Sequence, residues 1–129
     1  MLVEQRIAAS PATVFSYLTQ PDKFVQWMGA RAWLDAKGGG AFRIDVDGEH
    51  IASGQYREVD PPRRLVMTWG WEGSGDVPPG SSTVEITLEP VGEQQTLLRL
   101  RHTGLPSEEQ RDSHRQGWTM YVGKLASIF

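Results

Sequence analysis

Apolar residues recur at a helical spacing over the C-terminal part of the chain. Six of them stand where one face of an α-helix would place them: Trp118, Tyr121, Val122, Leu125, Ile128 and Phe129. This spacing follows the helical period of about 3.6 residues. Toward the N-terminus the same face becomes polar, with His114 and Arg111. We therefore predict one long helix over residues 107–129, aromatic and apolar at one end and polar at the other.

Upstream of this helix, apolar and polar residues alternate with a period of two, which predicts β-strands. Phe42, Ile44 and Val46 alternate with Arg43 and Asp45. The same alternation returns in three later segments, 65–71, 84–88 and 97–102. Turn signals separate the strands at 47–48, 60–62 and 90–93, and residues 73–82 are too rich in Gly and Pro for regular structure.

The N-terminal part predicts a strand over residues 2–7 and then two short helices. Ser10 and Pro11 form a helix start, because Ser caps free backbone N–H groups and Pro fits the first helical turn. The second short helix is expected over residues 21–27. The whole order predicts an α+β fold, in which a curved antiparallel sheet of about six to seven strands wraps around the long C-terminal helix. We expect residues 1–129 to form one domain.

Composition narrows the function classes. The net charge of −3 gives no electrostatic reason to expect a nucleic acid partner. The chain has no cysteine, so disulfides and thiolate metal ligands are excluded. No signal peptide and no apolar run long enough to cross a membrane is visible, and a cytoplasmic location is therefore expected. Five tryptophans are many for this length, and some of them should line a groove or cavity.

Several short motifs stand in a fixed order along the chain. They are Ser10-Pro11, Val14-Phe15, Trp27, Gly39-Gly40, Phe42-Arg43, Asp60-Pro61-Pro62, Leu65, Thr68-Trp69, His102-Thr103-Gly104-Leu105-Pro106 and Gly117-Trp118. Together they resemble the helix-grip superfamily of START domains, polyketide cyclases and the birch-pollen allergen Bet v 1. Within it they resemble the branch homologous to the activator of the heat-shock protein 90 ATPase. The resemblance implies a helix-grip fold, and its members range from lipid carriers to cyclases and co-chaperones.

Two histidines are the strongest polar candidates for a site. His102 ends the strand face that carries Leu98 and Leu100, so it should point where those leucines point. His114 lies on the same side of the predicted helix as Trp118. The two imidazoles would then bracket the polar end of a ligand. The alternative is that His102 is a core histidine satisfied by a backbone carbonyl or by the helix. A metal site would need a third ligand, which no spacing supplies, so neither a metal nor a cofactor is expected.

Our first hypothesis is a binding module that encloses a small hydrophobic or aromatic molecule. The wall of its cavity would be formed by Phe42, Met67, Trp69, Trp71, Leu98, Leu100, Trp118 and Tyr121. His102 and His114 would form the polar end.

Two other classes stay open. A cyclase or dehydratase would use His102 or Tyr121 as its general acid or base. The sequence shows no second proton-transfer partner and no nucleophile motif such as G-x-S-x-G, so a non-enzyme is favoured. A co-chaperone-like domain that activates an ATPase would instead need an exposed apolar patch for its protein partner. The sequence does not decide between a monomer and a homodimer.

Overall fold

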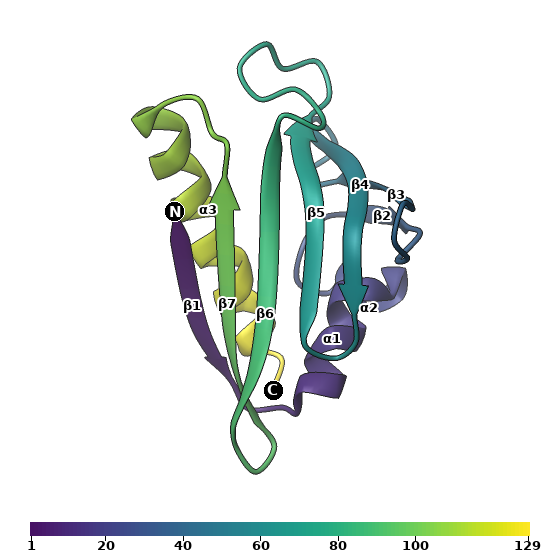
Figure 1. Cartoon of the computed structure of the whole chain (residues 1–129), viewed down its shortest axis with the longest axis vertical. Helices are drawn as coiled ribbons and strands as arrows, with labels where there is room; N and C mark the ends of the chain where they lie inside the picture. The colour runs from purple at the N-terminus through teal and green to yellow at the C-terminus, as the bar shows by residue number, and fades with distance from the viewer.

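The computed structural model describes residues 1–129 and contains one antiparallel sheet with three helices (Figure 1). The elements in chain order are β1 (Leu2–Ile7), α1 (Pro11–Thr19), α2 (Pro21–Phe24), β2 (Arg31–Leu34), β3 (Ala41–Asp45), β4 (Ile51–Asp60), β5 (Arg64–Trp71), β6 (Ser82–Gly92), β7 (Gln95–Thr103) and α3 (Glu108–Ala126). The predicted α+β architecture is thereby confirmed. None of the helices combines the length and the apolarity needed to cross a membrane.

The seven strands follow the order β1-β7-β6-β5-β4-β3-β2. Strands β2 to β7 form a meander, in which each strand pairs with its neighbour in the sequence. The first strand is the exception, because β1 pairs with β7, from Leu2 opposite Arg101 to Ile7 opposite Thr96. Figure 1 shows all three helices on the same side of the sheet, with α3 behind β1 and β7. We call this side of the sheet the inner face and the opposite side the outer face.

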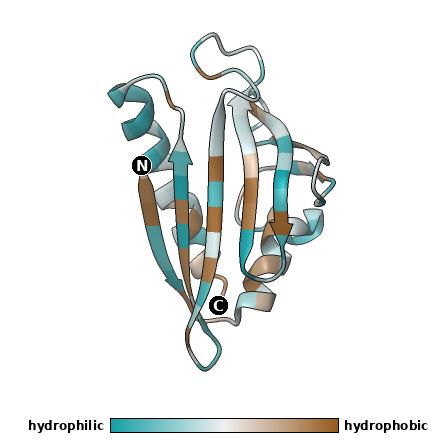
Figure 2. Ribbon diagram, viewed as in Figure 1, coloured by the Kyte–Doolittle hydropathy of each residue, from teal (hydrophilic) through white to brown (hydrophobic).

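The core lies between the inner face and the helices. Strand β5 supplies Leu65, Met67 and Trp69 to it, and α3 supplies Trp118, Val122 and Leu125. The alternation along each strand places these apolar residues on one face and polar residues on the other. Figure 2 shows the result as apolar bands that interrupt the polar stretches of the central strands.

The first short helix and the long C-terminal helix both begin where the sequence predicts, each with a serine cap. The Ser10 hydroxyl accepts a hydrogen bond from the Thr13 N–H at the start of α1. The Ser107 hydroxyl accepts one from the Gln110 N–H at the start of α3 (3.1 Å). These caps satisfy backbone donors that have no partner within the helix.

Two predicted helix ends are wrong. The C-terminal helix stops at Ala126, so Ile128 and Phe129 lie beyond it and remain 36 % and 39 % exposed. Beyond Ala126, the N–H groups of Ile128 and Phe129 bond to carbonyls three residues back, so the last turn is of the tighter 3₁₀ type. The second short helix likewise stops at Phe24 instead of residue 27. There Trp27 is held by a different bond, from its indole N–H to the Tyr17 carbonyl (2.9 Å).

Candidate ligand-binding site

A cavity of about 550 Å³ opens between strand β5 and the N-terminal half of α3. Trp69 and Trp71 face it from the sheet, and His114, Trp118 and Tyr121 face it from the helix. The turn between β3 and β4 and the loop after β5 form its rim. Three indole rings and a phenol therefore form part of its wall, whereas its mouth is polar.

Two of the three tryptophans in the cavity wall, Trp71 and Trp118, are fixed by histidines. The indole N–H of Trp71 donates to Nε2 of His114 (2.9 Å), and Nδ1 of His114 donates to the Gln110 carbonyl (2.8 Å). Since an indole nitrogen can only donate, Nε2 of His114 must be the acceptor and its proton must be on Nδ1. The ring of Trp71 thus keeps its orientation without a ligand.

A second pair of the same kind lies deeper in the core. The indole N–H of Trp118 donates to Nδ1 of His102 (3.0 Å). The proton of His102 is therefore on Nε2, which donates to the Ser82 hydroxyl (2.8 Å). Ser82 in turn donates to the Trp69 carbonyl (2.8 Å). The imidazoles of His102 and His114 lie 5.0 Å apart, so the two pairs form one network.

This network leaves His102 no free nitrogen. Its side chain is completely buried and does not line the cavity. The alternative reading of a core histidine satisfied by the helix describes its place in the structure. Burial, and then the neighbouring His114, lower the pKa of His102 to about 3, so the ring is neutral near pH 7.

The contact between His102 and Ser82 does not have the polarity of a nucleophile and its base. A general base must accept the hydroxyl proton of the nucleophile. Here Nε2 of His102 already carries a proton, and the hydroxyl of Ser82 directs its own proton to a backbone carbonyl. The pair therefore acts as a structural connection between β6, β7 and α3.

The structure brings half of the expected site residues together. Trp69, Trp71, His114, Trp118 and Tyr121 line the cavity. The others do not: Met67, Leu98, Leu100 and His102 lie in the core outside the cavity, and so does Phe42, whose ring stacks on Trp69 with centroids 5.7 Å apart. The reason lies in α3, whose apolar half fills the inner face with Val122 and Leu125, so only its polar half leaves space.

Gly117 marks the place where that space begins. Glycine is unfavourable within a helix, so its presence indicates either a close approach to the sheet or room for a ligand beside Trp118. A Cβ atom at Gly117 would meet no heavy atom within 4 Å, so no close approach exists there. Gly117 instead lines the cavity. At Gly54 on β4, in contrast, a Cβ atom would clash with the Thr68 carbonyl oxygen, so the two strands approach closely there.

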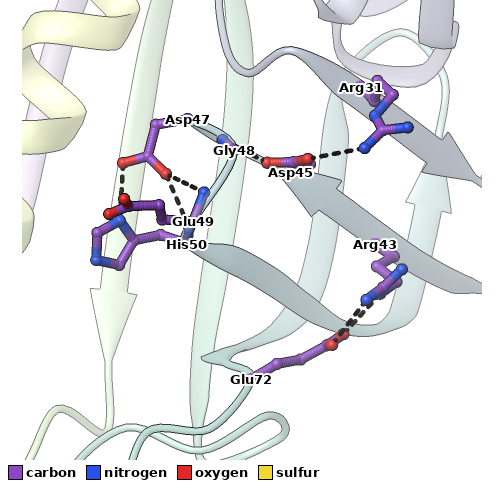
Figure 3. Close-up of polar contacts among 8 residues, drawn as sticks. All are labelled: Arg31, Arg43, Asp45, Asp47, Gly48, Glu49, His50 and Glu72. Carbon is purple, nitrogen blue, oxygen red and sulfur yellow. Dashed lines mark hydrogen bonds and ion pairs between the residues drawn. The ribbon is translucent and has the colours of Figure 1, made fainter.

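Asp47, His50 and Glu72 form the polar rim of the cavity (Figure 3), and of these three the sequence reasoning missed Asp47 and His50. Asp47 and Gly48 were recognised only as a turn signal. The Asp47 carboxylate accepts from the N–H groups of Glu49 (3.0 Å) and His50 (2.8 Å) and pairs with Nδ1 of His50 (2.7 Å). The signal that would have found it is this turn, because a hairpin turn presents its acidic residue at the end of the sheet.

Hydrogen bonds keep both rim carboxylates ionised. The backbone N–H of His50 and then its side chain lower the pKa of Asp47 to about 2. The same pair raises the pKa of His50. Two hydrogen bonds from Arg43 (2.9 and 3.1 Å) lower the pKa of Glu72. Burial, and then the charge of Asp47, raise the pKa of Tyr121, which lines the same cavity.

A second groove, of about 580 Å³, lies on the outer face of the sheet. Its charged lining residues are Arg43 and Arg57. Trp33 borders it from the edge strand β2 and is 50 % exposed. The guanidinium groups of Arg31 and Arg43 lie 5.9 Å and 5.8 Å from the Trp33 ring.

Comparison with known protein families decides the family. The family model described as "Activator of Hsp90 ATPase homolog 1-like protein" matches residues 8–129. The chain belongs to this family. The branch suggested by the sequence motifs is thereby confirmed. Among curated proteins, no sequence matches the chain.

Solved structures of family relatives have the same fold. An AHSA1-like protein from Rhizobium etli is 45 % identical, with a TM-score of 0.76; the match covers 99 % of this chain and 81 % of that protein. CalU16 from Micromonospora echinospora is 33 % identical, with a TM-score of 0.76, over 96 % and 71 % of the two chains. DynU16, a protein of the dynemicin biosynthetic locus, is 26 % identical, with a TM-score of 0.84. That match covers 98 % of this chain, which spans 45 % of the length of DynU16.

Proposed function

We propose that this protein is a binding module for a small aromatic molecule, held between β5 and α3. The observation that carries the proposal is the cavity of about 550 Å³ lined by three indole rings and a phenol. This volume lies within the range of roughly 300–1,000 Å³ that small-molecule sites occupy, and such sites are largely apolar with a few polar groups.

The preorganisation of the wall supports this proposal. The polar N–H groups of Trp71 and Trp118 are bonded to histidines, so these rings offer the cavity mainly carbon and π surface. Contacts among Trp69, Trp71 and Trp118 hold the rings at fixed angles, with centroids 4.9 Å to 5.7 Å apart. A ligand that enters this space need not order the side chains that bind it, which favours affinity.

A cavity-filling variant tests the proposal. Leucine at position 117 would place its side chain in the cavity from a helical site where a Cβ atom meets nothing. We expect Gly117→Leu to abolish the binding of 2-(2-naphthyl)ethanol, an uncharged aromatic probe, as measured by isothermal titration calorimetry. The matched control is Gly123→Leu, which changes another helical glycine with open space that does not line the cavity. Equal binding by both variants, or no saturable binding by the unmodified protein, would refute the proposal.

A protein-interaction function is the second candidate, and the outer groove favours it. Trp and Arg are the residues most often found at binding hot spots, and here an exposed Trp33 stands beside Arg31 and Arg43. Because the charged residues of this groove are all arginines, the occupant we propose is an acidic segment of a partner protein. The family description points to the heat-shock protein 90 ATPase as a partner to test.

The corresponding experiment measures the ATPase rate of purified heat-shock protein 90 at rising concentrations of this protein. We expect stimulation that Trp33→Ala together with Arg57→Glu removes and that the cavity variant Gly117→Leu retains. Absence of stimulation, or stimulation that both variants retain, would remove the outer groove from this role.

A further inference from the structure

The permanent charges around the inner cavity are of one sign. Its lining residues include the carboxylates Asp47 and Glu72 but no lysine or arginine. Both histidines of the lining are already engaged, His50 with Asp47 and His114 through hydrogen bonds at both ring nitrogens. An anionic ligand would therefore meet no free cation in the cavity.

Each of the two carboxylates has one basic partner, Arg43 for Glu72 and His50 for Asp47. Arg43, the partner of Glu72, belongs to the outer groove and does not line the inner cavity. The hydrogen bond with Asp47 raises the pKa of His50, and the two side chains pair at the rim. Because these side chains are 65 % and 50 % exposed, the pair is weak, and an ammonium group can compete with His50 for Asp47. The charge of Asp47 also acts across the cavity, where it contributes to the raised pKa of Tyr121.

The aromatic wall also attracts cations. The faces of indole and phenol rings carry negative charge density and attract ammonium groups, most strongly for Trp. Two of these rings lie near the rim: Trp71 precedes Glu72 on the chain and contacts the His50 ring, with centroids 6.4 Å apart, and Tyr121 is close enough to Asp47 for its charge to act on the phenol. Aromatic faces beside a carboxylate are the usual environment in which proteins bind organic ammonium ions.

We infer that the inner cavity selects aromatic ammonium compounds, with the ring of the ligand between the tryptophans and its ammonium group at Asp47. This inference rests on the proposed binding function and adds the charge class of the ligand. It excludes aromatic carboxylates and phosphates, because their charge would face Asp47 and Glu72 without a lysine or arginine to compensate.

Three probes of nearly equal shape test the inference on the unmodified protein. They are 2-(2-naphthyl)ethylamine, which is cationic near neutral pH, 2-(2-naphthyl)ethanol, which is neutral, and 2-naphthylacetate, which is anionic. By isothermal titration calorimetry we expect the amine to bind roughly 5- to 30-fold more tightly than the alcohol, as for a partly desolvated charge–carboxylate and cation–π contact. The anion should bind more weakly than the alcohol, and added salt should reduce the difference between amine and alcohol.

A charge-removing variant locates the effect. Asparagine at position 47 keeps an oxygen that can accept the turn N–H groups of Glu49 and His50 but removes the negative charge. We expect Asp47→Asn to bring the amine to within about three-fold of the alcohol while the affinity for the alcohol stays the same. Glu49→Gln, which removes a neighbouring charge that does not line the cavity, should change neither value.

The outcomes separate the two proposals. If the alcohol binds as tightly as the amine, or if the anion binds most tightly, the inference on charge is wrong and the binding function stands. If the preference for the amine persists in Asp47→Asn, Asp47 does not hold the ammonium group and the inference is wrong in its placement. If none of the three probes binds, the proposed binding function itself is refuted.

Discussion

The inner cavity and the outer groove have nearly the same volume, about 550 and 580 Å³, but opposite chemistry. The inner cavity has aromatic walls with carboxylates at its mouth. The outer groove has an exposed tryptophan with arginines. Strand alternation produces this difference, because neighbouring residues of one strand point to opposite faces. The sheet therefore presents two surfaces of different chemistry. Variants on each face can test the two proposed kinds of partner separately.

Replacing one tryptophan on each face gives the largest contrast. Trp118 is 4 % exposed and supplies the hydrogen bond to His102, whereas Trp33 is half exposed. We expect Trp118→Ala to lower the free energy of unfolding by about 3–5 kcal/mol, as large core truncations do. Trp33→Ala should cost less than about 1 kcal/mol, as surface changes do. Urea unfolding measures both. Similar losses for the two variants would contradict the assignment of the two faces.

Acid should destabilise the protein through His102, which is buried on the inner side of the sheet. The pKa of His102 is about 3 in the folded protein and near 6.5 when unfolded. Between these values the unfolded chain binds more protons, so stability is full above pH 6.5 and is lost as the pH falls toward 3. Between pH 7 and pH 5 the loss should be about 1–2 kcal/mol. Urea unfolding at the two pH values measures it.

His50, at the cavity mouth, changes stability in the opposite direction. Its folded pKa is raised by Asp47, so its contribution is present below pH 6.5 and is lost as the pH rises through the folded value. When the pH is lowered from 7 to 5, the free energy of unfolding should therefore fall further in His50→Gln than in the unmodified protein. NMR titration of the three histidines provides the control: His50 should titrate, and His102 should stay neutral until the protein unfolds. Titration of His102 near pH 6.5 would show that its burial is incorrect.

Sequence patterns predicted the fold well because each element repeats its signal. Period-two alternation recurred strand after strand, and two serine caps marked the helix starts. Even the weakly patterned first strand lies where it was expected, since pairing with β7 stabilises it. The errors fell at helix ends, where no long-range pattern operates.

The site was harder to predict because it depends on where packing stops. Leu98 and Trp69 are both aligned with the inner face, yet only Trp69 lines the cavity. The difference arises because α3 covers one part of the sheet closely and another part loosely, which periodicity does not show. Asp47 was missed for a related reason: a turn residue becomes part of a site only through the element opposite it, here the helical turn that carries Tyr121.

Replacing either of two glycines with alanine should change the free energy of unfolding by a smaller amount, with opposite signs at the two positions. Gly117 is helical with open space around it, so Gly117→Ala should raise the free energy of unfolding by about 0.5–1 kcal/mol through helix propensity. Gly54, on β4, has the Thr68 carbonyl where a Cβ atom would stand, so Gly54→Ala should destabilise the protein. Thermal unfolding of both variants checks the signs. A destabilised Gly117→Ala would indicate that the cavity beside the helix is filled by protein.

The smallest effect concerns the ion pair that joins the two surfaces. Arg43 lies in the outer groove and Glu72 on the inner rim, and their contact neutralises a carboxylate at the cavity mouth (Figure 3). Arg43→Gln should free that carboxylate and strengthen the binding of 2-(2-naphthyl)ethylamine by roughly two-fold, a small factor because the site is open to water and salt. Arg57→Gln is the control, since Arg57 borders only the outer groove. Calorimetry at low salt, where screening is weakest, gives the best resolution. Equal affinities in the two variants would mean that Glu72 does not act on the inner cavity, so that Asp47 alone sets its charge.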